Sequence, residues 1–325
     1  MTLPYTLRLL CVLAVAAGLI LALSQIALAL AASTILRRLD NLPARWRERI
    51  LYGLQIGPAL LGVFVAAAVC LPAYLRGETN LAGESVSSLC LFVAGLTVVC
   101  FAVAIVRGLR NMLRTLRFAS LCRRSGRLLT RAGAIPVLAI PDAGPPVCLI
   151  GFFRPLILVA AGFDGALPAA FDLALAHECS HAHHRDNWKL LTLSLLPRFD
   201  RLLPGGDPWS KPWQQAADWA ADDDAVQGSP ARSALLAEAL VRAARAAHPA
   251  PASRASCICT ALTTADAALA LRIDRLLHPR ASNRFSGSSL LLALAALALF
   301  VAATACTLSP WIYEFSERLL HLGAA

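Results

Sequence analysis

The sequence predicts an α-helical integral membrane protein with four transmembrane helices and an α+β domain between the third and the fourth. The first observation is composition: 58% of the 325 residues are hydrophobic and 15% are charged. Charged residues make up about a quarter of an ordinary soluble domain. The second observation is a set of runs of roughly twenty apolar residues without a charge, the length needed to cross ~30 Å of hydrocarbon. These runs lie at 9–33, 53–75, 86–106 and 288–308.

The first apolar run could also be a cleaved signal peptide, because it ends in small residues of the kind found at cleavage sites. Its apolar part is longer than the core of such a peptide, and Arg8 is the only basic side chain before it. We therefore predict a span here. The segment 1–106 is expected to hold three transmembrane helices, with a basic cytoplasmic loop at 34–50.

The placement of arginine predicts the orientation, since cytoplasmic loops carry an excess of basic residues. The loop at 34–50 holds five arginines, whereas the loop at 76–85 holds one, and eight more follow the third run. The domain at 107–286 is therefore expected in the cytoplasm. The segment 287–325 is expected to hold the fourth span and a short external tail, so that both termini lie outside a bacterial inner membrane.

The net charge of +10 is not expected to serve nucleic-acid binding. The arginines flank apolar runs and are not interleaved with aromatic residues. Membrane lipid is the expected partner instead. Arg110, Arg114 and Arg117 recur at helical spacing, which predicts that the third span continues as a basic helix along the lipid headgroups.

The domain at 107–286 starts with strand patterns and continues with helical ones. Short apolar runs bounded by turn residues predict strands at 135–140, 147–153 and 155–160. Segments rich in alanine and leucine predict helices near 168–186, 210–228, 231–247 and 261–278. A small sheet followed by helices is an α+β arrangement.

The stretch HECSH at 177–181 has the spacing of a metal site. His177 and His181 are four residues apart, so they project from one helix face and can both reach one zinc ion at about 2.0 to 2.1 Å. Glu178 is offset by about 100° and can address a metal-bound water instead. Zinc acidifies that water, and a carboxylate can take its proton as the water attacks an amide carbonyl. We therefore predict one zinc ion, with Glu178 as the catalytic base.

A third ligand is expected from a helix further along the chain. Asp218 and Asp222 lie four residues apart on one helical face. We expect Asp218 to complete the zinc site and Asp222 to hydrogen-bond a ligand imidazole. The alternative is an acidic helix turn that faces water, which would suit Asp222 and its two neighbours. Three other ligand-type residues are expected to be bystanders: Cys179, His183 and His184.

In these features the chain resembles the BlaR/MecR-type family of membrane zinc metallopeptidases, which carry a cytoplasmic gluzincin-like (zincin) domain between a third and a fourth span. The resemblance rests on the four-span layout and on the segments 151–159, 175–187, 218–226 and 271–280. It implies zinc ligands His177, His181 and Asp218, with Glu178 as general base. The family usually has glutamate where this chain has Asp218. Aspartate is shorter by ~1.5 Å, so either the helix lies closer or zinc is held more weakly.

The resemblance further implies an endopeptidase that cleaves a cytoplasmic protein, such as a transcriptional repressor, in response to a membrane signal. Two other functions stay open: an HtpX-like quality-control protease for membrane proteins, and a non-proteolytic signalling or scaffold protein that uses zinc for structure. In related gluzincins an edge strand binds extended substrate by β-augmentation; residues 151–159 would be that edge, unless they form an ordinary strand. We expect no β-lactam-binding sensor domain after the fourth span.

Overall fold

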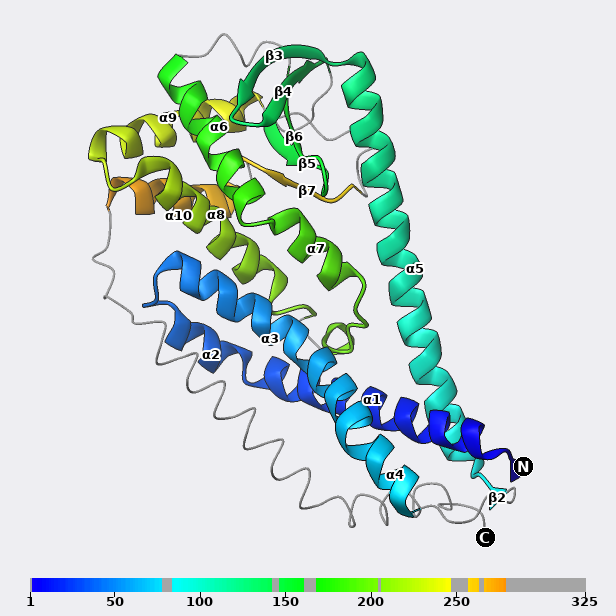
Figure 1. Ribbon diagram of the computed structural model, residues 1–325. Coiled ribbons are helices and arrows are strands. Elements are labelled where there is room, and N and C mark those ends of the chain that lie inside the picture. Colours follow the sequence, from blue (N-terminus) through cyan, green and yellow to red (C-terminus); the bar gives the residue numbers. More distant parts are fainter. Residues whose placement is uncertain are drawn as a thin grey trace.

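The computed structural model describes the chain in seven segments (Figure 1). They are residues 2–77, 84–141, 146–160, 168–203, 206–246, 257–262 and 266–278. The predicted fourth span, the tail after it and the middle of the loop at 76–85 lie outside these segments. The described part is mostly helical, with one five-stranded sheet and a two-stranded pair of β1 (Thr2–Leu3) and β2 (Glu84–Ser85).

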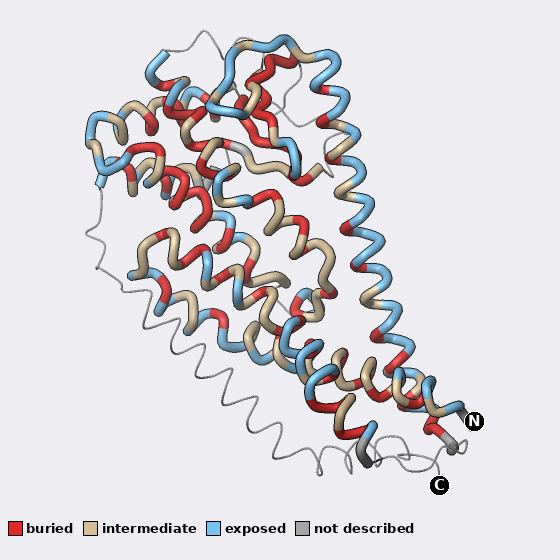
Figure 2. Tube along the Cα trace, viewed as in Figure 1, coloured by how far each residue is buried: buried red, intermediate tan, exposed pale blue. Residues whose placement is uncertain are grey.

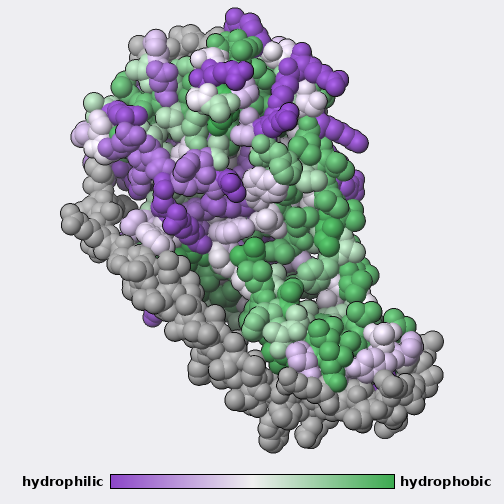
Figure 3. Space-filling view, in the orientation of Figure 1, coloured by the Kyte–Doolittle hydropathy of each residue, from purple (hydrophilic) through white to green (hydrophobic). Residues whose placement is uncertain are grey.

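Three helical segments are long and apolar enough to cross a membrane, so this is a membrane protein. They are α1 (Tyr5–Leu30), the continuous stretch Ala44–Leu75 and α5 (Ser88–Ser125). The second consists of α3 (Ala44–Val65), a π-helical turn (Ala66–Cys70) and the start of α4 (Leu71–Gly77). Figure 3 shows hydrophobic side chains gathered over these helices, while hydrophilic ones gather over the rest of this face. The first three predicted spans are thus found as apolar helices, with ends shifted by several residues.

The segment expected as a basic loop at 34–50 is largely helical. It comprises most of α2 (Ala32–Leu39) and the first two turns of α3. Leu39 and Leu51 pack with Trp209 and Trp213, which stand at the start of α8 (Ser210–Val226). The two helices therefore join the spans to the rest of the protein instead of merely linking one span to the next.

Helix α5 extends well past its apolar half. At 1.5 Å per residue its 38 residues measure about 57 Å, against ~30 Å of hydrocarbon. It continues in one direction through its arginine-rich half (Figure 1), and Ala119 and Cys122 pack beneath the sheet. The arginine-rich half therefore continues the apolar half and contacts the sheet. Its position along the lipid headgroups stays a prediction.

The main sheet has the strand order β3-β4-β6-β5-β7. Its strands are β3 (Arg127–Ala132), β4 (Ile135–Ile140), β5 (Val147–Ile150), β6 (Leu156–Ala160) and β7 (Cys259–Ala261). Only β4 and β6 pair in parallel. The expectation of a substrate-binding edge at 151–159 is wrong for β6, which lies inside the sheet with β4 on one side and β5 on the other.

Helices lie on both faces of this sheet, and the residues of its inner strands are mostly buried (Figure 2). Alternate strand residues face opposite ways: Ile157 joins a core with the later helices, whereas Leu158 joins a core with the end of α5. The later helices are α6 (Pro168–His183), α7 (Asp186–Ser194), α8, α9 (Pro230–Ala246) and α10 (Asp266–Leu277). They match the predicted helices with two exceptions. The helix predicted at 168–186 ends at His183 and α7 follows. The helix predicted at 261–278 begins only at Asp266, and Ala261 belongs to β7.

Candidate metal centre

Helix α6 brings the HECSH residues into the interior. Its first half is rich in alanine and leucine, and Leu173 and Ala174 pack into the sheet core. The next turns consequently lie inside the protein, where His177, Glu178 and His181 are at most 1% exposed. The Nε2 atoms of the two histidines lie 3.1 Å apart. The spacing of four residues between His177 and His181 thus brings their two Nε2 atoms together, as predicted.

Helix α8 supplies the third group. Oδ1 of Asp218 lies 3.6 Å from Nε2 of His181. One ligand atom from each of His177, His181 and Asp218 lies within 4.8 Å of the others, so these three buried residues could hold a metal ion. Asp218 and Asp222 are 6% and 1% exposed, which excludes the water-facing alternative for both. Asp223, whose side chain is 49% exposed, does face water.

The Nδ1 atom of His177 faces Asp222, as the sequence predicted. The distance to Oδ1 is 2.9 Å, off the line of an ideal hydrogen bond. Asp222 in turn accepts two hydrogen bonds from Arg272 of α10, at 2.9 and 2.6 Å. Arg272 is 1% exposed and also lies 3.9 Å from Asp218. Its guanidinium therefore neutralises a carboxylate that would otherwise be a buried, uncompensated charge.

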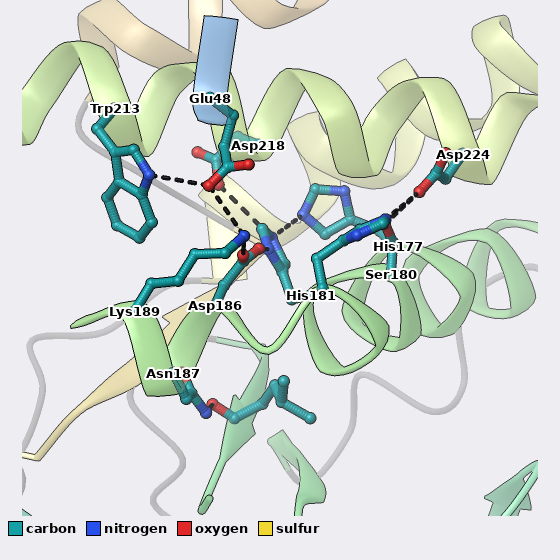
Figure 4. Close-up of polar contacts among 12 residues, drawn as sticks. Glu48, His177, Ser180, His181, Asp186, Asn187, Lys189, Trp213, Asp218 and Asp224 are labelled. Atoms are coloured by element: carbon teal, nitrogen blue, oxygen red, sulfur yellow. Dashed lines mark hydrogen bonds and ion pairs between the residues drawn. The ribbon is translucent and has the colours of Figure 1, made fainter. Parts of the chain in front are cut away.

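His181 has a parallel arrangement built from different elements (Figure 4). Its Nδ1 lies 2.7 Å from Oδ2 of Asp186 in α7. Lys189, one turn further along α7, donates to Oδ1 of Asp186 at 2.7 Å and to Glu48 of α3 at 2.9 Å. Each histidine is thus held by a carboxylate, and each carboxylate is held by a cation. Asp186, Lys189, Glu48 and Arg272 were not predicted as supporting residues. The i, i+3 spacing of Asp186 and Lys189 indicates their contact, whereas no neighbouring residue in the sequence indicates a role for Arg272 or Glu48.

The two imidazoles fit a cation between them. A carboxylate beside each Nδ1 favours the tautomer with hydrogen on that nitrogen, which leaves a lone pair on each Nε2. Two lone pairs 3.1 Å apart repel each other unless a proton or a metal ion lies between them. With the Asp218 carboxylate beside them, the donors are two nitrogens and one oxygen, a set that leaves a fourth position open on a tetrahedral ion.

Glu178 is a fully buried carboxylate that no other side chain holds among the described residues. Its polar contact is with the backbone N–H of Leu149, off the line of an ideal hydrogen bond. Burial raises the pKa of Glu178 to about 8, against the opposing charge of His181. A carboxylate with such a pKa can both hold and release a proton near neutral pH.

The pKa values of the three other groups diverge. Burial lowers the pKa of His177 to about 4, against the effect of Asp222, so this imidazole is neutral at pH 7. Burial acts in the same direction on His181, but the Asp186 carboxylate outweighs it and raises the pKa to about 9. Burial raises the pKa of Asp218 to about 6. A metal ion and a proton therefore compete for Nε2 of His181.

The expected bystanders lie apart from the three ligand atoms. His183 is exposed. Nε2 of His184 lies 3.0 Å from Asp224, which also accepts from the hydroxyl of Ser180. Cys179 packs against the core, and burial raises the pKa of its thiol. A raised pKa disfavours the thiolate form that a nucleophile needs.

A cleft of about 440 Å³ opens beside His181. One wall is the loop 151–155, which follows β5; the other wall is the turn between α6 and α7, where Arg185 has a left-handed backbone. Phe153, 71% exposed, contacts Trp188 edge to face, with ring centroids 4.8 Å apart. Asn187 fixes the loop by donating to the carbonyl of Gly151 at 3.1 Å. A ligand in this cleft would lie next to His181, one of the three residues that could hold a metal ion.

The arrangement can bind a cation, handle a proton and admit a ligand from one side. No protein-family model matches the chain, and no curated protein matches it. A functional assignment therefore depends on the geometry of this site and on the sequence resemblance.

Proposed function

We propose that the protein is an integral membrane zinc endopeptidase of the BlaR/MecR type, with four spans and a cytoplasmic zincin-like domain. The observation that supports this most is the convergence of His177, His181 and Asp218 beside the buried carboxylate of Glu178, which no other side chain among the described residues holds. A structural zinc site is closed by four protein ligands and needs no such carboxylate, whereas a hydrolytic site needs three ligands, an open position and a base.

Each residue of the site has a distinct role in this chemistry. Zinc, held by the two imidazoles and Asp218, would polarise the scissile carbonyl and acidify water. Glu178 would take a proton from the attacking water and return it to the leaving amine, for which its buried position beside the two histidines is suitable. Asp222 and Asp186 keep the histidine rings oriented through their Nδ1 atoms.

The substrate is a cytoplasmic protein, and by the resemblance a transcriptional repressor. The cleft supports a polypeptide substrate because it places apolar rings of Phe152, Phe153 and Trp188 beside His181. Such rings can hold side chains of an extended segment while its backbone passes the metal. Membrane lipid surrounds the spans, and the arginine distribution supports a cytoplasmic domain with both termini outside the bacterial inner membrane.

The test compares wild type with Glu178→Gln in cells of the native host. Glutamine has the shape of glutamate but cannot act as a base, so we expect cleavage to fall by at least a hundredfold. New protein N-termini would be compared between the two strains, and zinc content would be measured on both purified proteins. His177→Ala serves as the ligand control, for which we expect loss of zinc.

One cleaved regulator that persists intact in the Glu178→Gln strain supports this proposal. Many stabilised membrane proteins would favour quality control instead. If wild type and Glu178→Gln hold one zinc each and yield the same N-termini, the protein is not a protease. Unchanged zinc content in His177→Ala would contradict the ligand set.

A further inference from the structure

One face of α3 carries four polar side chains that all contact the other elements of the site region. They recur at helical spacing and point away from the apolar surface of the span. We name this set the α3 polar stripe: Arg45, Glu48, Tyr52 and Gln55. Their partners are Asp224 of α8, Lys189 and Thr192 of α7, and Arg198 in the loop after α7. The second apolar helix is therefore joined to α8 through Arg45, to α7 through Glu48 and Tyr52, and to the loop after α7 through Gln55.

Glu48 is the buried charge of the stripe. It is 5% exposed and lies between α7 and α8. One carboxylate oxygen accepts from Nζ of Lys189 at 2.9 Å and from the indole nitrogen of Trp213 at 3.0 Å. Burial of a carboxylate costs several kcal/mol unless it is paired and hydrogen-bonded. The position of Glu48 thus dictates where the ammonium of Lys189 must lie.

Lys189 links Glu48 to the proposed metal ligand His181. Its ammonium lies between two carboxylates, Glu48 and Asp186, and Asp186 holds Nδ1 of His181 at 2.7 Å. Burial by itself lowers the pKa of Lys189, but the two carboxylates raise it, so the ammonium stays charged. Lysine has a flexible stem. Among the described residues, Glu48 is the group that holds the ammonium opposite Asp186. Its removal would therefore leave the stem of Lys189 free to move and would weaken the hydrogen bonds that orient His181.

His177 is supported by Asp222 and Arg272, a chain of residues that we name the His177 arm, and this chain ends at a different element. Arg272, which holds Asp222, makes its other hydrogen bond to the carbonyl of Leu262. Among the described residues, that arm stays within the sheet-and-helix domain. The corresponding His181 arm, formed by Asp186, Lys189 and Glu48, reaches α3. In the part of the chain that the structure describes, the hydrogen bonds that run from α3 to a ligand imidazole therefore lead to His181.

We propose that Glu48 is a positioning residue that acts on His181 through Lys189 and Asp186, and that metal affinity thereby depends on how α3 sits against α7. This inference rests on the metal site of the proposed function and not on peptide cleavage. It gives α3 a role in the metal centre. A signal that moves the spans could then change the position of His181 through Glu48, Lys189 and Asp186.

The experiment measures zinc affinity of the purified full chain in detergent by competition with a chromophoric chelator. The visible spectrum of the cobalt-loaded protein gives a second readout, because it reports ligand geometry. Glu48→Gln keeps the shape and removes the charge. Loss of a partner behind a metal ligand costs about 10-fold to 100-fold in affinity, so we expect Glu48→Gln to weaken zinc binding by about 10-fold and to alter the cobalt spectrum.

Tyr52→Phe is the matched control, since it removes one hydrogen bond between the same two helices, one turn further along α3. We expect its zinc affinity to stay within twofold of wild type. Lys189→Met and the double variant Glu48→Gln with Lys189→Met complete a cycle. If Glu48 acts through Lys189, the double variant loses no more than Lys189→Met alone.

Wild-type affinity and an unchanged cobalt spectrum in a folded Glu48→Gln protein would overturn the inference. So would equal losses in Glu48→Gln and Tyr52→Phe, which would mean that the contact only docks the helices. Failure of the proposed function looks different: wild type would bind zinc and respond to Glu48→Gln, yet cleave nothing. A wild type without zinc affinity would overturn both.

Discussion

At the scale of single residues, the side chain of Asp218 is short for a third ligand, so its distance from the two histidines decides whether it can share an ion with them. Asp218 is flanked on α8 by the buried alanines Ala217 and Ala221. Small side chains let helices approach closely, since the distance between helix axes depends on the side chains at the contact. Of the two possibilities that the sequence left open, a closer helix is the one that this packing supports, because Oδ1 of Asp218 already lies 3.6 Å from Nε2 of His181.

Arg272 offers a residue-scale prediction. Its ion pair with Asp222 is buried, with both side chains 1% exposed, whereas the neighbouring pair of Arg275 and Asp223 joins the same two helices in partly exposed positions. Arg272→Met leaves a buried carboxylate unpaired, which costs about 3 to 5 kcal/mol. Arg275→Met is expected to cost under ~1 kcal/mol. Denaturant unfolding of both variants measures the difference, and equal losses would contradict the distinction.

At the scale of elements, the start of α8 depends on a carboxylate. Asp207 accepts hydrogen bonds from the backbone N–H of Trp209 and Ser210 at 3.0 and 3.1 Å and pairs with Arg198 at 2.7 Å. Burial raises the pKa of Asp207, but the Ser210 hydroxyl, Arg198 and these N–H groups outweigh burial and lower it to about 2. The helix that carries Asp218 is therefore anchored by a group that is charged when folded.

The sign of the resulting pH dependence comes from the lowered pKa. The stabilisation is fully present above the unfolded value near 4 and is lost as the pH falls through about 2. We expect Asp207→Asn to lower the free energy of unfolding by about 2 kcal/mol at pH 7, with a difference that shrinks between pH 4 and pH 2. Asp274→Asn, at an exposed position, is the control. A difference that does not change with pH would contradict this assignment.

Elements with a strong local pattern could be predicted from the sequence. Three of the four apolar runs are found as helices, while the fourth lies outside the described residues. The i, i+4 spacing predicted how His177 and His181 converge. β3 was missed because its burial is slight and it carries arginine at both ends of its apolar part. Glu48 and Lys189 are 141 residues apart, and each is an ordinary charged residue in its own surroundings. Only the packing of α3 against α7 makes them partners of a metal ligand.

At the scale of the whole molecule, the orientation that we propose has three crossings, which would place the N-terminus and the sheet domain on opposite sides of the membrane. The pairing of β1 with β2 agrees with this, because it joins the N-terminus to the segment between the second and third spans. The arginines of α2, α3 and α5 all lie toward the domain, where the positive-inside tendency places the cytoplasm.

Cysteine labelling in intact cells tests this orientation. Pro4→Cys changes an exposed residue just before α1, and it is expected to react with a membrane-impermeant maleimide in intact cells, because it lies outside. Arg127→Cys, at an exposed residue of β3, is expected to react only after the cells are broken. Wild type gives the background from the native cysteines. Labelling of Arg127→Cys in intact cells would reverse the orientation and would put a cytoplasmic substrate out of reach of His177 and His181, since the spans hold the sheet domain on one side of the membrane.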